Sequence, residues 1–479
     1  MRQLIGVGIA SLLVGGLVWA LAGDGSARDS AELLTDPHAV RDPLEGGLVE
    51  QDEGYLALLA PTAPVDLEPQ HESPLAPLRP GQLYGLAFQY DSPIYSSPGR
   101  GRPAGIMRRG KQVRLGELLT GGGCKGGEWY RLVDTEGVVC TADGFQIGPE
   151  PQDFHIRQVF AATHRSMPFR YGKVNSRQAV RYYDLPTPEQ QAAAEAAARG
   201  ASGYPKVAER RMEGDYLVAI DRLEGPADRQ FVRTIRGRYV RRDRIDPKPM
   251  PSMVGERISG REQLPLAFIF GDETVPLLSW RDGRLREVGV AEKHARFLVE
   301  GEELWSGVPV VVGARGFAVP RKRVRIARTI PRPSSVPTGQ RFVHVNLTEQ
   351  TLVAYDGDGK PVFATLISSG KEGHDTPTGT YRINDKHIST TMRGSDPHEG
   401  YYEVEEVPWT MFYYEAYALH GAYWHNDFGK VRSHGCTNLS PIDARFLFYW
   451  TSPDVPQEWN GLRDSQVGTY VVMTRDEAG

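Results

Sequence analysis

The sequence is poor in cysteine and carries little net charge. Only three cysteines occur in 479 residues. The net charge of −4 at pH 7 gives no global signal for binding a polyanion. The 53 glycines and 35 prolines favour many turns and short strands over long helices. A chain of this length is expected to hold more than one domain, because single hydrophobic cores stop growing well before it.

The N-terminus carries a targeting signal. Arg2 precedes an apolar run over residues 4–22, so the rest of the chain is expected to be exported to the periplasm or cell envelope. Ala20-Leu21-Ala22 fits a signal-peptide cleavage site, but the run is also near the length that spans a bilayer. No cysteine follows it, which excludes a lipoprotein anchor. Residues 1–23 are therefore interpreted as a signal peptide or an anchor in the inner membrane.

Residues 24–80 are acidic, contain proline and are poor in aromatics. Such a segment cannot bury enough apolar surface to offset its chain entropy, which predicts a disordered linker. It could give reach from the membrane to the cell wall, or serve only as a connection.

Residues 81–150 are predicted to form one small β-barrel, because short apolar runs recur with turn residues between them. Cys124 and Cys140 flank the run at residues 129–133 and can pair in an oxidising compartment. Closing a loop of this size stabilises a fold by roughly 3 kcal/mol. The segment resembles a bacterial SH3-like domain, a module that binds cell-wall peptide or acts as a spacer. Exposed aromatics would favour binding, and buried ones a spacer.

Residues 151–330 carry a weak internal repeat, which predicts a β-rich middle region of two further modules. Arg236-Gly237-Arg238-Tyr239-Val240 is echoed by Arg315-Gly316-Phe317-Ala318-Val319. One helix is predicted after Thr187, with Pro188 in its first turn and Gly200 at its end.

Arginines gather over residues 229–244 and 321–332. Nucleic acid is disfavoured as a partner, because the chain is expected to be exported and aromatic residues are sparse between the arginines. Two interpretations stay open: an acidic wall polymer binds there, or the arginines form a solvated strand face.

A proline-rich linker at residues 331–339 precedes alternating strand patterns that open the last domain, residues 340–475. This domain contains Ser433-His434-Gly435-Cys436-Thr437-Asn438, with His420-Gly421 twelve residues upstream. Free cysteine is only a few per cent ionised near neutral pH, so a neighbouring base or cation must activate it as a nucleophile. A free thiol beside imidazoles in a glycine-bearing loop therefore predicts cysteine acyl transfer.

The segment resembles the active-site motif of the L,D-transpeptidases, the YkuD-type catalytic domain. Ser369-Gly370-Lys371, Thr376-Pro377-Thr378-Gly379 and Phe428-Gly429-Lys430 match further segments of that family. The resemblance implies a β-sandwich with the cysteine on a loop, and so a mainly β chain with SH3-like modules before it. It implies Cys436 as nucleophile, His420 as general base and the amides around Gly435 as oxyanion hole. His434 is expected to shape the loop and add charge near the sulfur, and Ser433 to position it.

Substrate contacts are expected from Gly421, Asn438, His425 and Trp409. His425 is equally well interpreted as a loop-packing residue, and Trp409 as part of the core. Ser440 and Pro441 predict a helix directly after the motif. No cofactor and no metal are expected.

The resemblance implies peptidoglycan stem peptides as substrate, with D-alanine released from a tetrapeptide and an amine as acceptor. Water as acceptor would make a carboxypeptidase, and a protein lysine would make a wall-anchoring enzyme. Two rival classes are a zinc-dependent wall hydrolase using His420, His425, His434 and Cys436, and a non-catalytic wall-binding protein.

Overall fold

The computed structural model describes residues 76–99, 101–151, 160–201, 203–259, 263–271, 273–396 and 400–476. Over these ranges the chain is mainly β, as predicted, and its α-helices are α3 (Pro188–Ala198) and α4 (Pro441–Trp450). The predictions for residues 1–23 and nearly all of residues 24–80 fall outside the described residues. Among the residues that are described, no helix has the length and apolar character needed to cross a bilayer.

The described chain divides into two compact units, and Ala267–Val324 make up the smaller one. Its strands follow the order β18-β17-β21-β20-β19. A small core of Leu278, Val310, Val312 and Ala318 packs within it. Strands β16 (Leu266–Ile269) and β22 (Val324–Ala327) begin and end the segment. The five central strands are β17 (Thr274–Arg281), β18 (Arg284–Glu292), β19 (Arg296–Trp305), β20 (Val308–Gly313) and β21 (Phe317–Pro320).

In the larger unit, the first part of the chain forms a five-stranded sheet in the order β6-β5-β4-β1-β7. A disulfide joins Cys124 to Cys140, with 5.6 Å between their Cα atoms. The aromatics of β5, Trp129 and Tyr130, are buried. Because a wall-binding module would expose such aromatics, their burial favours a spacer. The strands are β1 (Leu83–Ala87), β4 (Gln112–Leu119), β5 (Trp129–Leu132), β6 (Val138–Cys140) and β7 (Phe145–Gly148).

Two strands of this first part, β2 (Asp91–Ile94) and β3 (Gly105–Arg108), leave its sheet and join a different one. β3 pairs with β31 (Gly461–Arg463), close to the end of the chain. Trp459 lies in the same apolar cluster as Phe145 and Leu115. The first β module therefore shares strands and core with the last 20 or so residues described.

The middle region contributes seven strands to the 14-stranded sheet and also contains α3. Thr187 caps α3, Pro188 starts it, and Gly200 follows it at φ +106°, so the predicted helix is confirmed. β11 pairs in parallel with β28, which joins this region to the C-terminal domain. The strands are β8 (Arg170–Val174), β9 (Val180–Tyr182), β10 (Ala208–Arg211), β11 (Asp215–Glu224), β12 (Phe231–Thr234), β13 (Tyr239–Arg241) and β14 (Ile245–Pro247).

The weak sequence repeat corresponds to a repeated local structure. In each copy a glycine with positive φ precedes a strand, Gly237 at +73° and Gly316 at +76°. Each strand, β13 or β21, leads into one turn of 3-10 helix, η1 (Arg242–Arg244) or η4 (Arg321–Arg323), and then a further strand. Glycine is required at the first position because left-handed backbone strains other residues.

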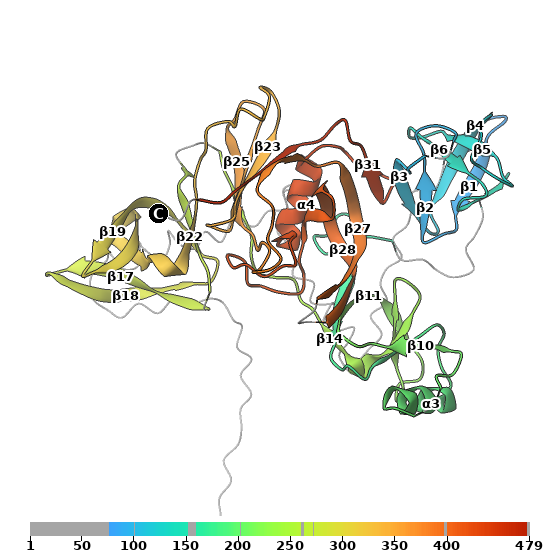
Figure 1. Cartoon of the computed structure of the whole chain (residues 1–479), viewed down its shortest axis with the longest axis horizontal. Coiled ribbons are helices and arrows are strands. Elements are labelled where there is room, and N and C mark those ends of the chain that lie inside the picture. Colours follow the sequence, from blue (N-terminus) through green and yellow to red (C-terminus); the bar gives the residue numbers. More distant parts are fainter. Residues whose placement is uncertain are drawn as a thin grey trace, which may run out of the picture. The chain divides into compact units, whose positions relative to one another are not determined.

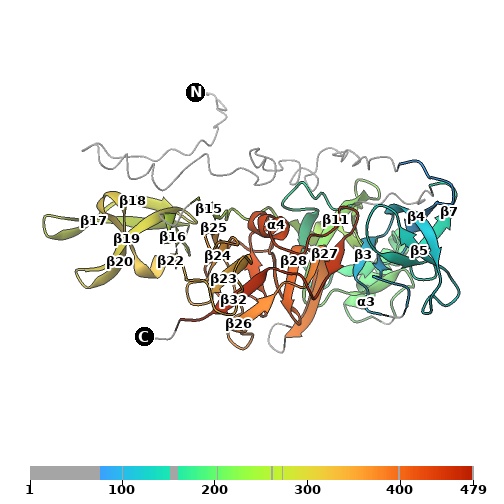
Figure 2. The same cartoon turned by 90° about the horizontal axis from the view of Figure 1, so that it is seen from above.

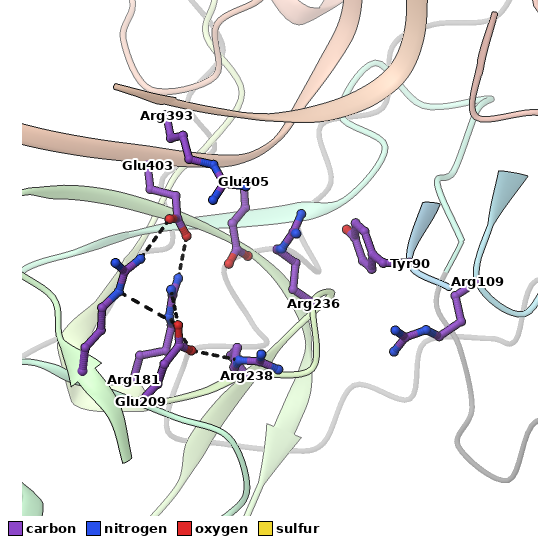
Figure 3. Close-up of a pocket in the computed structure, with 10 residues that line it drawn as sticks. Tyr90, Arg109, Arg181, Glu209, Arg236, Arg238, Arg393, Glu403 and Glu405 are labelled. Carbon is purple, nitrogen blue, oxygen red and sulfur yellow. Dashed lines mark hydrogen bonds and ion pairs between the residues drawn. The ribbon is translucent and has the colours of Figure 1, made fainter. Parts of the chain in front are cut away.

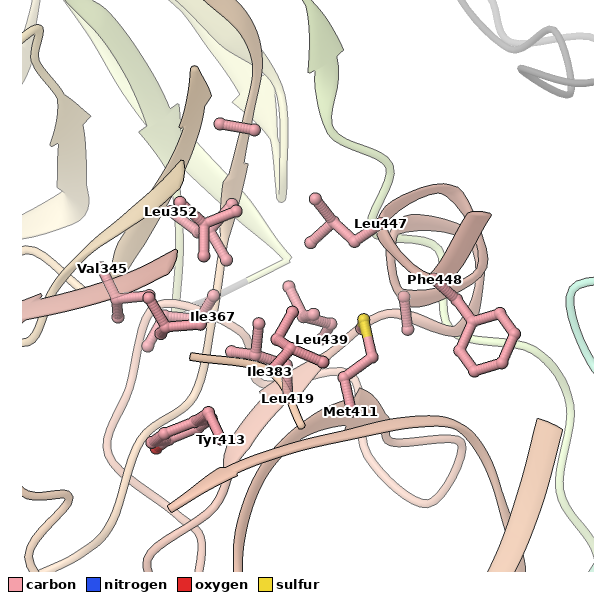
Figure 4. Packing of buried hydrophobic residues seen from close by; sticks show 14 of the residues in the cluster. Val345, Leu352, Ile367, Ile383, Met411, Tyr413, Leu419, Leu439, Leu447 and Phe448 are labelled. Atoms are coloured by element: carbon pink, nitrogen blue, oxygen red, sulfur yellow. The ribbon is translucent and has the colours of Figure 1, made fainter. Parts of the chain in front are cut away.

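The C-terminal domain packs a six-stranded sheet, in the order β15-β25-β24-β23-β32-β26, against a long hairpin. Figures 1 and 2 both show α4 between this sheet and the hairpin. Leu352, Leu439, Leu447 and Phe448 belong to the shared core seen in Figure 4. The sheet strands are β15 (Glu256–Arg257), β23 (Phe342–Asn346), β24 (Thr351–Tyr355), β25 (Pro361–Leu366), β26 (Gly379–Arg382) and β32 (Tyr470–Thr474).

The hairpin, β27 (Asp385–Asp396) with β28 (Gly400–Tyr414), connects the domain to the rest of the unit. β28 pairs with β11 along one stretch and, further on, with β29 (Tyr417–Gly421), which in turn pairs with β30 (Thr437–Leu439). The candidate active site is built where β29 and β30 meet.

Candidate active site

The cysteine loop, residues 433–438, leads into β30. β30 lies parallel to β29, with His420 opposite Asn438 and Leu419 opposite Thr437. β30 begins at Thr437, so Cys436 lies in the bend directly before the strand, beside the end of β29 that carries His420. The Cys436 Sγ is half-buried and donates to the Ala416 carbonyl at 3.5 Å.

Ser433 and Gly435 fix the shape of this loop. The Ser433 hydroxyl donates to the Cys436 carbonyl at 2.5 Å and accepts from the Gly435 amide at 3.0 Å. Gly435 has φ +117°, and a Cβ there would lie 2.7 Å from the Tyr417 ring. Glycine is therefore required by backbone conformation and by space. Because the Gly435 amide is bound to Ser433, it is not available to a substrate oxyanion.

The upstream part of the chain that contains the family-like segments forms hydrogen bonds with the backbone of the cysteine loop. Ser368 exchanges two backbone hydrogen bonds with Asn438, both of 2.9 Å. The Thr376 hydroxyl donates to the Gly435 carbonyl at 2.7 Å and accepts from the Gly370 amide at 2.9 Å. The motifs that the sequence analysis singled out, far apart in the chain, thus meet at one loop.

His420 is buried and held by its own strand. Its Nδ1 lies 3.4 Å from the carbonyl oxygen of Gly421. With Nδ1–H donated to that carbonyl, Nε2 is the unprotonated nitrogen. Burial lowers the pKa of His420 to about 4, although the Gly421 carbonyl opposes this shift. At neutral pH the ring is therefore uncharged and able to accept a proton.

The thiol is also neutral in the resting protein. Burial raises the pKa of Cys436 to about 11, against a smaller lowering by a hydrogen bond to the Ala418 backbone. Desolvation disfavours the charged form of both the thiol and the imidazole. The proton has to move from Sγ to a base during attack.

His434 lies in a cluster of charged side chains, so its role goes beyond adding charge near the sulfur. Its ring stacks on Tyr402 at 4.8 Å, and its Nε2 lies 3.4 Å from Lys371 Nζ. Its Nε2 is also 3.7 Å from Asp396, which binds His374 at 2.5 Å.

The ligand atoms of His374, Asp396 and His434 lie within 4.8 Å of one another, the one such group of metal-binding side chains in the part of the chain that the structure describes. The rival zinc set of His420, His425, His434 and Cys436 does not come together in those residues. The Lys371 ammonium beside His434 opposes a cation at the group that does.

His425 and Asn438 stabilise the loop from within. Both are buried, and the Asn438 side-chain amide contacts His425 Nε2 at 2.9 Å. The Asp427 amide donates to His425 Nδ1 at 3.2 Å. The contacts agree with the loop-packing interpretation of His425. Gly421 is also buried, and an added Cβ would lie 3.0 Å from Pro408.

The expectation that Trp409 contacts substrate is wrong. Its side chain is fully buried in the core between the sheet and the hairpin, and its Nε1 donates to the Ser166 carbonyl at 2.5 Å. The alternative interpretation as a core residue holds.

Sequence reasoning missed several residues around the loop. Tyr402 is half-buried, and the nearby Cys436 contributes to raising its pKa after burial itself. Asp396 and Tyr402 lie on the hairpin, which carries no motif, so only its folding brings them close, whereas His374 lies in the loop between two family-like segments. Lys371 and Thr376 lay inside family-like segments and could have been singled out there.

Comparison with known proteins identifies the family of the C-terminal domain. Residues 340–473 match the family model described as YkuD, the L,D-transpeptidase catalytic domain. These residues form a YkuD-type catalytic domain. No curated protein matches the chain.

Solved structures similar to the chain include several L,D-transpeptidases. One from Enterococcus faecium is 25% identical over 29% of this chain and 50% of its own, with a TM-score of 0.24. The catalytic domain from E. faecium is 25% identical over 29% of this chain and 100% of its own, with a TM-score of 0.23. An L,D-transpeptidase from Mycobacterium smegmatis is 16% identical over 47% and 93%, with a TM-score of 0.23. The chain spans about half the length of the first solved structures it matches.

Proposed function

We propose that this chain is a peptidoglycan L,D-transpeptidase that works by cysteine acyl transfer. The observation that carries the proposal is the pairing of β29 with β30, which runs the strand that carries His420 beside the loop that carries Cys436, with His420 neutral at physiological pH. A neutral buried imidazole is a base that can take the thiol proton as attack begins. The YkuD-type domain supports a wall peptide as substrate.

In the proposed reaction, Cys436 Sγ attacks the carbonyl at the L-centre of diaminopimelate while its proton passes to His420 Nε2. The Cys436 amide is the loop donor left for the oxyanion, since the Gly435 amide is bound to Ser433. His420 then gives its proton to the leaving D-alanine amine, and a thioester remains. An amine from another stem attacks the thioester and loses a proton to His420. The Cys436 thiolate then leaves and takes this proton from His420, which restores the thiol.

The test is incubation with purified muropeptides carrying tetrapeptide stems, followed by mass spectrometry of the products. The parent protein is expected to release D-alanine and form dimers, and C436A to form none. Tripeptide without dimer would favour the carboxypeptidase. No product, together with no mass increase on treatment with a carbapenem, would contradict acyl transfer. Thermal unfolding of C436A shows whether its fold is kept.

A further inference from the structure

A cavity of about 430 Å³ opens in the larger unit, lined mostly by arginine. Its wall comes from the first β module, the middle region and the hairpin that also supports the cysteine loop. We name it the arginine pocket, and Figure 3 shows its side chains turned toward a common space. The lining residues are Tyr90, Arg109, Arg181, Glu209, Arg210, Arg236, Arg238, Arg393, Glu403 and Glu405.

Some of these arginines have carboxylate partners. Arg181 binds Glu403 at 2.5 Å and Glu209 at 2.7 Å, and Arg210 and Arg238 bind the same two carboxylates at 3.1 and 2.9 Å. Although burial raises the pKa of Glu403, the neighbouring Arg181 holds it below its usual value, so this carboxylate stays charged. Two carboxylates therefore neutralise part of the charge of three arginines.

The other three arginines have less compensation. Arg109 and Arg393 make no ion pair with any described residue, and Arg393 lies opposite Glu403 in the sheet. Arg236 lies 3.9 Å from Glu406, which Arg108 already binds at 2.8 Å. Burial lowers the pKa of Arg109, and repulsion from Arg238, Arg233 and Arg236 adds to this effect. The pocket thus holds an excess of positive charge in partly desolvated space, where an anion is bound strongly.

Glu405 is the exceptional group in this wall. It is fully buried, and its Oε2 accepts from the Ala219 amide at 3.2 Å, whereas its buried Oε1 has no hydrogen-bond partner among the described residues. Burial raises the pKa of Glu405 to about 8, outweighing Arg236 and Arg181, and the nearby Glu403 raises it further. At neutral pH the group is a carboxylic acid whose hydroxyl lacks an acceptor.

We propose that the arginine pocket is a binding site for a phosphate-bearing anion, such as a phosphodiester, with Arg109, Arg236 and Arg393 as its cations and the unpartnered Glu405 carboxyl in its wall. Guanidinium forks match phosphate oxygens in pairs. A protonated carboxyl can donate a hydrogen bond to a phosphodiester oxygen, which can only accept one. Of the two interpretations of the arginines at residues 229–244, this favours the acidic polymer, because Arg236 and Arg238 line an enclosed site.

The site lies on the hairpin of the active site but on the opposite face of β28. Glu403 and Glu405 line the pocket. Tyr402, the residue before Glu403 on β28, stacks instead on His434. Alternation along the strand therefore separates the anion from the cysteine loop by one layer of backbone. Binding there is independent of the acyl transfer proposed above.

The test is calorimetric titration of the full chain with a short glycerol phosphate oligomer, whose charge does not change between pH 6 and 9. Binding is expected at low salt, with R393Q weakening it about tenfold, since a charge-assisted contact is lost. The matched control R131Q alters an exposed arginine of β5 outside the pocket and should leave binding unchanged. Vesicles containing phosphatidylglycerol, titrated in parallel, show whether the phosphate can come from a lipid headgroup.

The role of Glu405 has its own signature. Wild-type affinity should fall about tenfold between pH 7 and 9, because the ionised carboxylate repels the ligand and no longer donates. E405Q keeps a donor without the titration, so it should bind as well at pH 7 and lose no affinity by pH 9. Absence of binding to both oligomer and vesicles would overturn the proposal, as would equal binding of citrate or an unchanged affinity in R393Q. Acylation of Cys436 by a carbapenem, measured on the same samples, keeps this result separate from the proposed enzymatic function.

Discussion

The cysteine loop and the arginine pocket share the β27–β28 hairpin, yet burial has opposite consequences in them. In the loop, His420 is buried and Cys436 is half-buried, neither has a charged partner among the described residues, and both are neutral at pH 7. In the pocket, Arg181 and Glu403 are buried together, and both stay charged. A low dielectric therefore suppresses isolated charges and preserves paired ones. The proposed nucleophilic chemistry uses the first situation, whereas in the arginine pocket the paired charges form the wall around the less compensated arginines proposed to bind the anion.

The largest effect is expected from removing the base that accepts the Cys436 proton. H420Q should slow acylation of Cys436 by a carbapenem about 10²- to 10⁴-fold, because general-base catalysis contributes about that much. The control is H344Q, which alters another buried histidine whose pKa burial also lowers to about 4. Stopped-flow fluorescence or mass spectrometry follows the acylation, and equal rates in both variants would remove His420 from the mechanism.

The neutral thiol predicts a steep pH profile. The pKa of Cys436 is raised, so its thiolate fraction grows about tenfold with each pH unit until pH nears 11. Alkylation by iodoacetamide should accelerate about 10³-fold between pH 7 and pH 10, without levelling off near 8.5 as a free cysteine does. The two other cysteines are joined in a disulfide and do not interfere. A plateau below pH 8 would show a thiolate stabilised in advance, contrary to the comparison.

Glu405 and Glu406 offer the same contrast in adjacent residues. Glu406 is buried and bound by Arg108 and Ser389, so E406Q should destabilise the fold by about 3 kcal/mol, because the buried Arg108 then keeps only the more exposed Asp91 as a carboxylate partner. Glu405 has a raised folded pKa of about 8, so the folded state holds a proton that the unfolded state has lost between pH 4.5 and 8. Stability from this group therefore falls as pH rises through that window, and E405Q should remove the fall. Urea unfolding at pH 5 and 8 measures both variants.

The smallest effect is expected from Ser433. S433A removes the hydroxyl that joins the Gly435 amide to the Cys436 carbonyl, at a cost of about 1 kcal/mol in unfolding free energy. It also releases the Gly435 amide, so acylation should change by about tenfold or less. S433T, which keeps a hydroxyl, is the matched control. A loss as large as that of H420Q would give Ser433 a direct part in the proton transfer.

Local patterns predicted local features well. The cap at Thr187 and the helix after Ser440 each depend on a few adjacent residues, and both have the expected form. The motif residues around Cys436 likewise meet in space, since turns and short hydrogen bonds encode their loop.

What sequence could not supply came from long-range pairing. Nothing local indicates that β3 pairs with β31, or that β28 runs beside β11. For the same reason Trp409 was open to two interpretations, since an aromatic beside a motif can line a groove or fill a core. The protonation state of Cys436 could not be predicted either, because desolvation depends on the surrounding packing and not on the neighbouring residues in the sequence.

The pairing of β3 with β31 sets a limit on when this protein can mature. The apolar cluster of the first β module includes Trp459, and Arg108 from its strand β3 binds Glu406. These partners are synthesised more than 290 residues later than β3. The first module cannot complete its interior until nearly the whole polypeptide has been synthesised. A fragment cut at residues 340 and 473 would leave β28 and β31 with open edges prone to aggregation, so biochemical work calls for the longer chain.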